Sequence, residues 1–159
     1  MKDIIIDFET LGNASETDNF IVLNMSCLLF DIDEKDEFEH LLANVQSFKF
    51  DIDEQIDIGW KAEKDTLEWW KKQSKEARKQ LEKSDEDIKI KQFVDDFSTI
   101  LNEAKIERIW SRGTDFDLPI LKRLFRQDNK QLNSYLPYWA ATDIRTYLKA
   151  LSDFKLKDL

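Results

Sequence analysis

The stretch "MKDIIIDFETLGN", residues 1–13, decides the fold because it predicts a buried strand that ends in two acidic residues. Alternation along a strand sorts its side chains into two faces, Ile4, Ile6 and Phe8 on one and Ile5, Asp7 and Glu9 on the other. Asp7 and Glu9 therefore project side by side, about 7 Å apart at the backbone. Two buried like charges cost several kcal/mol unless a cation lies between them. The pattern indicates a metal site, although a solvent-facing strand end with ordinary acids would show the same residues.

Length and composition indicate one globular domain that spans residues 1–159. The chain is 42% hydrophobic and 12% aromatic, which suits a packed core. No apolar run reaches about 18 residues, so no transmembrane helix is predicted. The start Met1-Lys2-Asp3 lacks the layout of a signal peptide, and Cys27 is the only cysteine. We therefore expect a protein of a reducing, cytoplasmic compartment, with Cys27 as a small core residue.

The net charge of −9 argues against a general nucleic-acid binder, which usually has a basic surface. It is compatible with an enzyme that holds a few nucleotides through divalent cations. Carboxylates that bind a metal count as negative in the sequence but are nearly neutralised in the loaded site.

Apolar periodicity predicts a mixed sheet flanked by helices, an α/β layer fold. The expected strands are 2–9, 20–31, 38–48 and 106–110, the second and third of which form a hairpin. The expected helices are 66–81, 86–104, 115–127 and one that begins near Asp143, and residues 51–64 are expected to form a loop. Asp65 is the predicted N-cap of helix 66–81, with Glu68 completing a capping box, and Asp143 is the predicted N-cap of the last helix.

A second acidic stretch, "WSRGTDFDLPILKRL", occupies residues 110–124. Helical spacing places Asp117 on one face with apolar residues, namely Ile120, Leu121 and Leu124. Asp115 lies off that face and suits the helix N-cap. An inward carboxylate needs a partner, and the simplest partner for Asp117 is the metal proposed between Asp7 and Glu9. The alternative is an ordinary acid at a helix N-terminus, favoured by the helix dipole.

Five segments in order resemble a known family: "DFETLGN", "TLEWWKKQSKEARK", "SDEDIK", "WSRGTDFDLPIL" and "ATDIRTYL". The "DFET" near the N-terminus and the "FD" that opens a helix after an apolar strand resemble the first two motifs of the DEDD superfamily of 3′→5′ exonucleases. The whole series is similar to the exodeoxyribonuclease A family of large tailed bacteriophages. The resemblance implies a ribonuclease H-like fold, two Mg²⁺ or Mn²⁺ ions, and action in the cytoplasm of the host cell.

The resemblance also assigns roles to particular residues. Asp7 and Glu9 match the metal ligands of the first motif, and Asp117 matches the aspartate of the second. Thr10 and Leu11 match positions that lie against the terminal nucleotide in such enzymes. Carboxylates without a Cys/His cluster suit Mg²⁺ or Mn²⁺.

The third motif of the family, a His or Tyr followed by a fourth Asp, has no counterpart. Leu148 and Lys149 stand where the His or Tyr belongs, Asp153 comes late enough for the Asp, and the only histidine is His40 in the expected hairpin. We therefore expect the C-terminal part of the fold to be missing from this chain.

The function that these residues imply is metal-dependent 3′→5′ exodeoxyribonuclease activity on a free, single-stranded DNA 3′ end. The first alternative is a catalytically incomplete module of the same fold that binds single-stranded ends or a protein partner. The second is an exoribonuclease. Trp69 and Trp70 could stack on bases, although two indoles packed in the core explain them as well. Arg112 could contact a phosphate, or lie on the surface.

Overall fold

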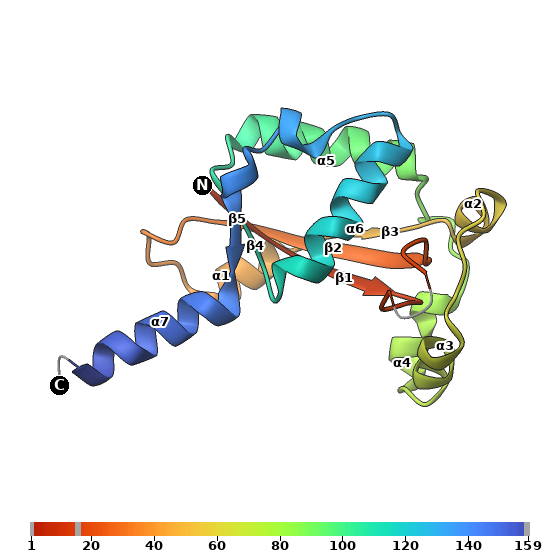
Figure 1. Ribbon diagram of the computed structural model, residues 1–159, viewed down its shortest axis with the longest axis horizontal. Coiled ribbons are helices and arrows are strands. Elements are labelled where there is room, and N and C mark those ends of the chain that lie inside the picture. The colour runs from red at the N-terminus through yellow and green to blue at the C-terminus, as the bar shows by residue number, and fades with distance from the viewer. Residues whose placement is uncertain (1, 15–16, 158–159) are drawn as a thin grey trace.

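The computed structural model describes residues 2–14 and 17–157, with side chains up to Asp153. Its described strands form one mixed five-stranded sheet of order β3-β2-β1-β4-β5 (Figure 1). Strands β1 and β2 are antiparallel, as are β2 and β3, while β4 is parallel to both β1 and β5. The strands are β1 Asp3–Thr10, β2 Val22–Phe30, β3 Gln46–Lys49, β4 Arg108–Ser111 and β5 Ala141–Asp143. This confirms the predicted mixed α/β sheet.

Helices α5 and α6 lie together on one side of the sheet, whereas α7 extends away from it (Figure 1). The apolar stripe of α5 is buried because Phe93, Val94 and Phe97 recur at helical spacing on its inner face. The α-helices are α1 Phe38–Ala43, α2 Ile52–Asp57, α3 Lys64–Lys71, α4 Lys75–Arg78, α5 Ile90–Ala104, α6 Thr114–Gln127 and α7 Ile144–Lys157. Short 3₁₀ turns occur at Lys79–Leu81, Leu132–Ser134 and Tyr138–Ala140.

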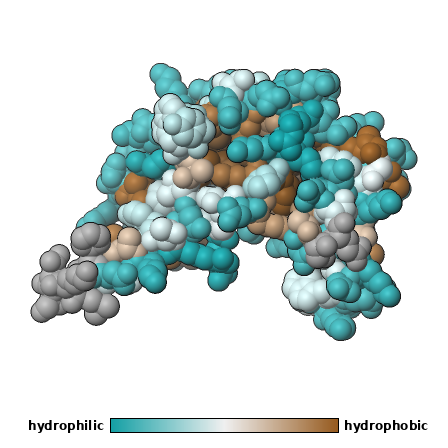
Figure 2. Space-filling model, viewed as in Figure 1, coloured by the Kyte–Doolittle hydropathy of each residue, from teal (hydrophilic) through white to brown (hydrophobic). Residues whose placement is uncertain are grey.

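The core lies between the sheet and helices α5 and α6. Ile4, Ile6 and Phe8 are buried, as the alternation of β1 predicts, and so is Cys27. Figure 2 shows hydrophobic residues over the centre of the molecule and a mostly hydrophilic rim. Among the described residues, no helix is both long and apolar enough to cross a membrane.

Strand β1 is longer than its neighbour β4, so the second half of β1 has no strand partner on that side. Only Asp3–Ile5 of β1 pair with β4, whereas β2 pairs with β1 along its whole length. Helix α6 follows β4 directly and crosses the open edge that β4 leaves. The carboxyl end of β1 therefore has room beside it for side chains from the first turn of α6.

The other end of β1 is fixed by Asp3, a residue that the sequence did not single out. Its fully buried carboxylate accepts hydrogen bonds from Arg108 Nε (2.5 Å) and Nη2 (2.9 Å), from Trp110 Nε1 (2.7 Å) and from the backbone N–H of Ile32 (3.1 Å). Burial alone would raise the pKa of Asp3, but the hydrogen bonds outweigh it and lower the pKa to about 2. One carboxylate thus joins β1 to β4 and to the end of β2.

Two predictions between residues 38 and 64 were wrong. The expected strand 38–48 is a helix, α1, followed by the short strand β3, so the predicted β2–β3 pairing is correct but His40 lies on the helix. Phe38–Ala43 consists largely of good helix formers, which the expectation of a hairpin after residues 20–31 overlooked. The expected loop 51–64 contains α2, because Asp51 caps it by accepting from the Glu54 N–H at 3.1 Å.

Three further features of the fold differ from prediction: one helix is broken, one helix has a different N-cap, and one strand was not expected. The expected helix 66–81 is broken into α3, α4 and a 3₁₀ turn, and α3 starts at Lys64 with Glu63, not Asp65, at its N-cap. Helix α6 has Gly113 at its N-cap, with φ 107°, so Asp115 is not the cap. Strand β5 was missed because its three residues carry too little periodicity. The predicted role of Asp143 is supported, since its Oδ1 accepts from the Arg145 N–H at 2.8 Å.

Replacing Asp3 by Asn is expected to destabilise the fold by about 3 kcal/mol, because it leaves the buried face of Arg108 without its counter-charge. Equilibrium unfolding in urea measures this loss. Asp33→Asn, an exposed acid near the same end of the sheet, is the matched control and should be nearly neutral.

The same carboxylate predicts the acid limb of stability. Its pKa is about 2 in the folded chain against 3.8 unfolded, so its contribution of about 2 kcal/mol is complete above about pH 4 and is lost as the pH falls toward about 2. Unfolding measured between pH 5 and pH 2 should show a shallower fall for Asp3→Asn than for the unmodified chain. Equal slopes for the two proteins would contradict the assignment.

Candidate active site at the carboxyl end of strand β1

A hydrogen bond between α6 and β1 brings the acidic residues of the two elements together. Asp117 is 4% exposed, and its Oδ1 accepts from the backbone N–H of Phe8 at 3.1 Å. Phe8 stands between Asp7 and Glu9 on the free edge of β1, so the carboxylate of Asp117 reaches the strand at the acidic pair. The inward direction predicted for Asp117 is confirmed, and Asp115 is exposed as expected.

Asp7 and Glu9 lie on the face of β1 opposite the core. Asp7 is exposed and Glu9 is half-buried. Desolvation raises the pKa of Asp7, and the charge of the exposed Arg112 partly opposes this. Desolvation also raises the pKa of Glu9, and the negative charge of Asp7 adds to that effect. Both carboxylates are therefore easier to protonate than free acids.

Asp117 is the most perturbed acid of the site. Burial, together with the charges of Asp7 and Glu9, raises its pKa to about 6 against the lowering effect of the Phe8 N–H. Burial thus destabilises the ionised form of all three carboxylates, and acidic neighbours add to this effect at Glu9 and Asp117. A bound cation would relieve the repulsion, so the donor chemistry fits a hard divalent metal.

The carboxylates do not form a closed ligand cluster. In the part of the chain that the structure describes, no three His, Cys, Asp or Glu side chains are grouped closely enough to hold a metal ion. Asp117 directs Oδ1 to the backbone of β1, in the plane of the sheet, whereas Asp7 and Glu9 project from the outer face. The three carboxylates therefore do not converge on one point, contrary to the expectation from the sequence.

A pocket of about 400 Å³ lies next to Glu9, between the end of β1 and helix α3. We call it the carboxylate pocket. Trp69 forms an exposed wall of it, and Phe116 of α6 closes another side. The residues that line it are Phe8, Glu9, Thr10, Gly12, Asn13, Asp65, Thr66, Trp69, Trp70 and Phe116.

The two predicted nucleotide-contacting residues occupy different environments. Thr10 lines the carboxylate pocket, with its Oγ1 donating to the carbonyl of Gly12 at 2.6 Å. Leu11 is 4% exposed and belongs to the core, and it does not line the pocket.

The two adjacent tryptophans differ in exposure. Trp70 is buried, with Nε1 donating to the Thr10 carbonyl at 2.9 Å, whereas Trp69 is 54% exposed.

The turn after β1 depends on Gly12, which sequence reasoning did not select. A Cβ at this position would lie 2.4 Å from the Cβ of Phe20, so no other residue fits without moving the backbone. The buried Glu63 accepts from the Asn13 N–H at 2.9 Å and donates its own N–H to the Leu11 carbonyl at 2.7 Å. The glycine in "ETLGN" was the available signal, since it follows a strand directly.

Comparisons with known proteins identify the class of enzyme to which the chain belongs. The fold and the matches together define a 3′-5′ exonuclease of the DEDD type with a ribonuclease H-like α/β fold. The model of the 3′-5′ exoribonuclease Rv2179c-like domain matches residues 2–158, and the chain belongs to that family. It is also 34% identical over 170 residues to a protein of Enterobacteria phage T4 named Exodeoxyribonuclease, a match that covers 95% of this chain and 72% of that protein. The resemblance and the enzyme class predicted from the sequence are confirmed.

Divalent metal is expected to stabilise the chain through Asp117. A cation that binds only the folded state at ten times its Kd raises the free energy of unfolding by about 1.4 kcal/mol, or about 3 °C in Tm. Thermal melts with and without Mn²⁺ measure this rise, which should be smaller below pH 6 because protons compete at Asp117.

Two isosteric variants localise the effect. Asp117→Asn should lose most of the Mn²⁺ shift, since the amide carries no charge, while keeping an oxygen to accept from Phe8. Asp115→Asn, two residues away and exposed, should keep the shift. An equal response of both variants would place the metal elsewhere.

Proposed function

We propose that this exonuclease removes nucleotides from a free, single-stranded DNA 3′ end by a two-metal mechanism. The observation that carries the proposal is the hydrogen bond from the Phe8 N–H to Asp117, which brings a third carboxylate to the acidic pair of β1. The carboxylate pocket opens beside Glu9, so a chain end held there has its last phosphodiester near the three acids.

Asp7, Glu9 and Asp117 would hold the metals through carboxylate oxygens, which suits Mg²⁺ or Mn²⁺. When bound, a pair of such ions supplies Lewis-acid stabilisation of both the attacking and the leaving oxygen of an in-line displacement. Burial disfavours the ionised form of each of these carboxylates, and a bound cation would offset that cost. Near neutral pH Asp117, whose pKa is about 6, has lost its proton and is free to bind the cation. Arg112, which lies close enough to lower the pKa of Asp7, supplies a positive charge for a substrate phosphate.

The carboxylate pocket orients the terminal nucleotide. Trp69 offers an exposed ring face for the base, and its edge-to-face contact with the buried Trp70, at 5.3 Å between centroids, limits its movement. Thr10 lines the same pocket, and the backbone between Thr10 and Asn13 is held by Glu63 and Trp70. Leu11 does not contact the nucleotide in this arrangement; its buried side chain anchors the same backbone in the core.

DNA is proposed as the substrate because 95% of the chain aligns with a protein named as an exodeoxyribonuclease. RNA is the second candidate, because the matching family is described as that of a 3′-5′ exoribonuclease. The two differ in the 2′-hydroxyl, which a site can use as a donor or an acceptor.

Matched oligonucleotides separate the two substrates. A 5′-labelled single-stranded DNA should shorten stepwise from its 3′ end in Mn²⁺, at least about tenfold faster than an RNA of the same sequence. Asp7→Ala should abolish the shortening, and Asp33→Asn should leave it unchanged. Faster degradation of RNA would reverse the substrate assignment, and metal-dependent binding without cleavage would favour the non-catalytic module.

Stacking on Trp69 is tested separately. Base–aromatic stacking is worth about 1–3 kcal/mol, so Trp69→Ala should raise KM for single-stranded DNA about tenfold or more. Trp139→Ala removes a tryptophan that is 71% exposed on the 3₁₀ turn before β5, outside the carboxylate pocket, and should not change KM. A KM that is the same for both variants would remove Trp69 from the proposed subsite.

A further inference from the structure

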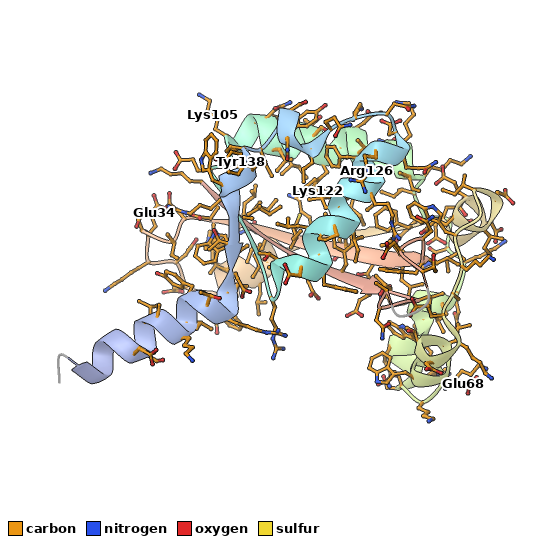
Figure 3. All side chains as sticks on the ribbon, viewed as in Figure 1. Glu34, Glu68, Lys105, Lys122, Arg126 and Tyr138 are labelled. Atoms are coloured by element: carbon orange, nitrogen blue, oxygen red, sulfur yellow. The ribbon has the colours of Figure 1, made fainter. Side chains whose placement is uncertain are left out.

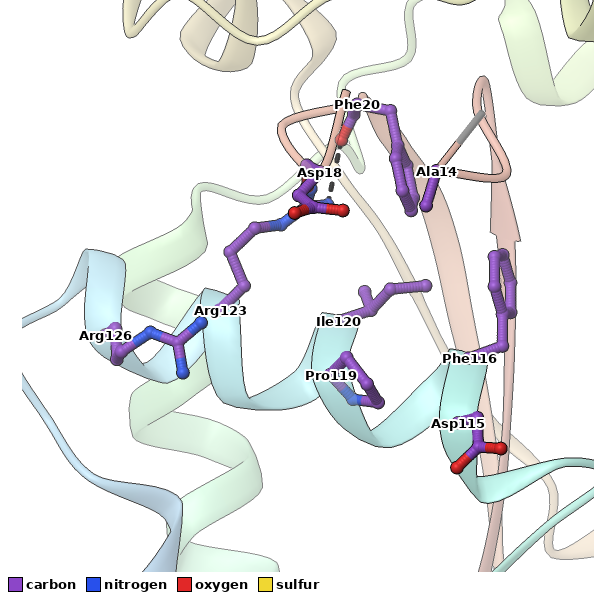
Figure 4. A pocket seen from close by; sticks show the side chains of 9 residues that line it. All are labelled: Ala14, Asp18, Phe20, Asp115, Phe116, Pro119, Ile120, Arg123 and Arg126. Carbon is purple, nitrogen blue, oxygen red and sulfur yellow. Dashed lines mark hydrogen bonds between the residues drawn. The ribbon is translucent and has the colours of Figure 1, made fainter. Parts of the chain in front are cut away.

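A second pocket, of about 340 Å³, lies between α6 and the segment that connects β1 to β2 (Figure 4). We call it the arginine pocket, after Arg123 and Arg126 at one of its ends. Asp115 lies at the opposite end in Figure 4, and Phe116, Pro119 and Ile120 of α6 form the apolar part. A volume near 300 Å³ is at the lower limit of small-molecule sites, about what one nucleotide requires.

Arg123 is a buried cation that forms no salt bridge with any residue that the structure describes. It is 9% exposed. Its Nη1 and Nη2 donate to the backbone carbonyls of Asp18 and Phe20, the latter at 2.8 Å, while its Nε has no acceptor among the described residues. Its guanidinium lies 4.5 Å from the ring centroid of Phe20 and 4.2 Å from that of Trp60. Neutral dipoles and ring faces thus hold a full positive charge at the pocket.

A second guanidinium adds to this charge. Arg126 is exposed, one turn further along α6, and lines the same end of the pocket (Figure 4). Burial and the nearby charge of Arg126 together lower the pKa of Arg123 to about 10, against the opposing effect of Asp18. The pocket's acids are Asp18 and Asp115, both exposed, and neither forms a salt bridge with Arg126 in the described residues. Asp18 lies beside Arg123, whereas Asp115 lies at the other end (Figure 4), so two guanidinium groups and one carboxylate meet at the arginine end. The excess of positive charge there favours an anion.

The arginine pocket adjoins the candidate active site. Phe116 lines both pockets, and the next residue along the chain is Asp117. The ring of Phe116 is nearly parallel to that of Phe20, with an interplanar angle of 7° and 6.1 Å between centroids. A strand with its terminal nucleotide in the carboxylate pocket can thus pass Phe116 and reach the two arginines.

We propose that the arginine pocket binds the nucleotide next to the 3′-terminal one, with Arg126 donating to its phosphate, the charge of Arg123 behind it, and Phe116 and Pro119 packing against its base. This inference rests on the proposed function, because it assumes that the chain end occupies the carboxylate pocket. The subsite would make recognition depend on at least two nucleotides rather than on the terminal one alone.

Binding measurements with one charge removed test the subsite. Arg126→Gln removes the exposed guanidinium without touching the buried Arg123. Lys122→Gln is the matched control, because Lys122 is exposed on the same helix, one turn before Arg126 (Figure 3), but does not line the arginine pocket. Fluorescence anisotropy with labelled dT₁₂ in Ca²⁺, chosen to slow hydrolysis, gives the affinity. Competition by thymidine 5′-monophosphate reports the binding of a single nucleotide, which the proposal places in the carboxylate pocket.

Arg126→Gln should weaken dT₁₂ binding about tenfold, reduce the slope of log affinity against log salt by about 0.7, and leave competition by the mononucleotide unchanged. Lys122→Gln should change none of these values. If Arg126→Gln and Lys122→Gln bind dT₁₂ as the unmodified chain does, or are weakened equally, the subsite is disproved while the proposed function stands. A loss of mononucleotide competition in Arg126→Gln would also overturn the placement. If the unmodified chain binds no oligonucleotide, the proposed function fails and the inference fails with it.

Discussion

The hydrogen bond from the backbone N–H of Phe8 to Asp117 is the interaction on which the arrangement of the site depends. It exists because β1 continues after its pairing with β4 has ended, which leaves an N–H on the sheet edge without a strand partner. A buried carboxylate from the first turn of α6 satisfies that donor. The same contact brings Asp117 to the backbone between Asp7 and Glu9, where desolvation raises the pKa of all three carboxyl groups and the charge of Asp7 adds to the effect on Glu9 and Asp117. A structural requirement of the sheet edge thus brings together the acids that we propose as metal ligands.

The ends of β1 are fixed by different means, which keeps this edge in place. At the start of the strand, Asp3 binds Arg108 and Trp110 of β4, so the parallel register of β1 and β4 is set by buried, charge-assisted hydrogen bonds. At its other end, Gly12 allows Phe20 to pack directly on the turn. Between these anchors the acidic pair has little freedom along the strand. The position of the site relative to α6 follows from both.

Two pockets with different lining residues lie beside the acids. The carboxylate pocket offers Trp69 and the acidic edge, whereas the arginine pocket offers positive charge held against aromatic rings. Phe116 separates them and belongs to both. In a chain with a net charge of −9, local positive charge of this kind would attract the nucleic-acid strand that we propose as substrate.

The sequence by itself determined the first strand (2–9 predicted, 3–10 observed), its inner and outer faces, the inward direction of Asp117 and the exonuclease class. These features depend on periodicity and on short, ordered motifs. It did not reveal α2 or β5, which are too short for a periodic signal, nor the helix in 38–48. Only the tertiary structure decided that Asp3 binds Arg108, that Trp69 is exposed while Trp70 is buried, and that Arg123 lies beside Phe20. These contacts join residues far apart in the chain, and their energies depend on distance and burial, which no local pattern encodes.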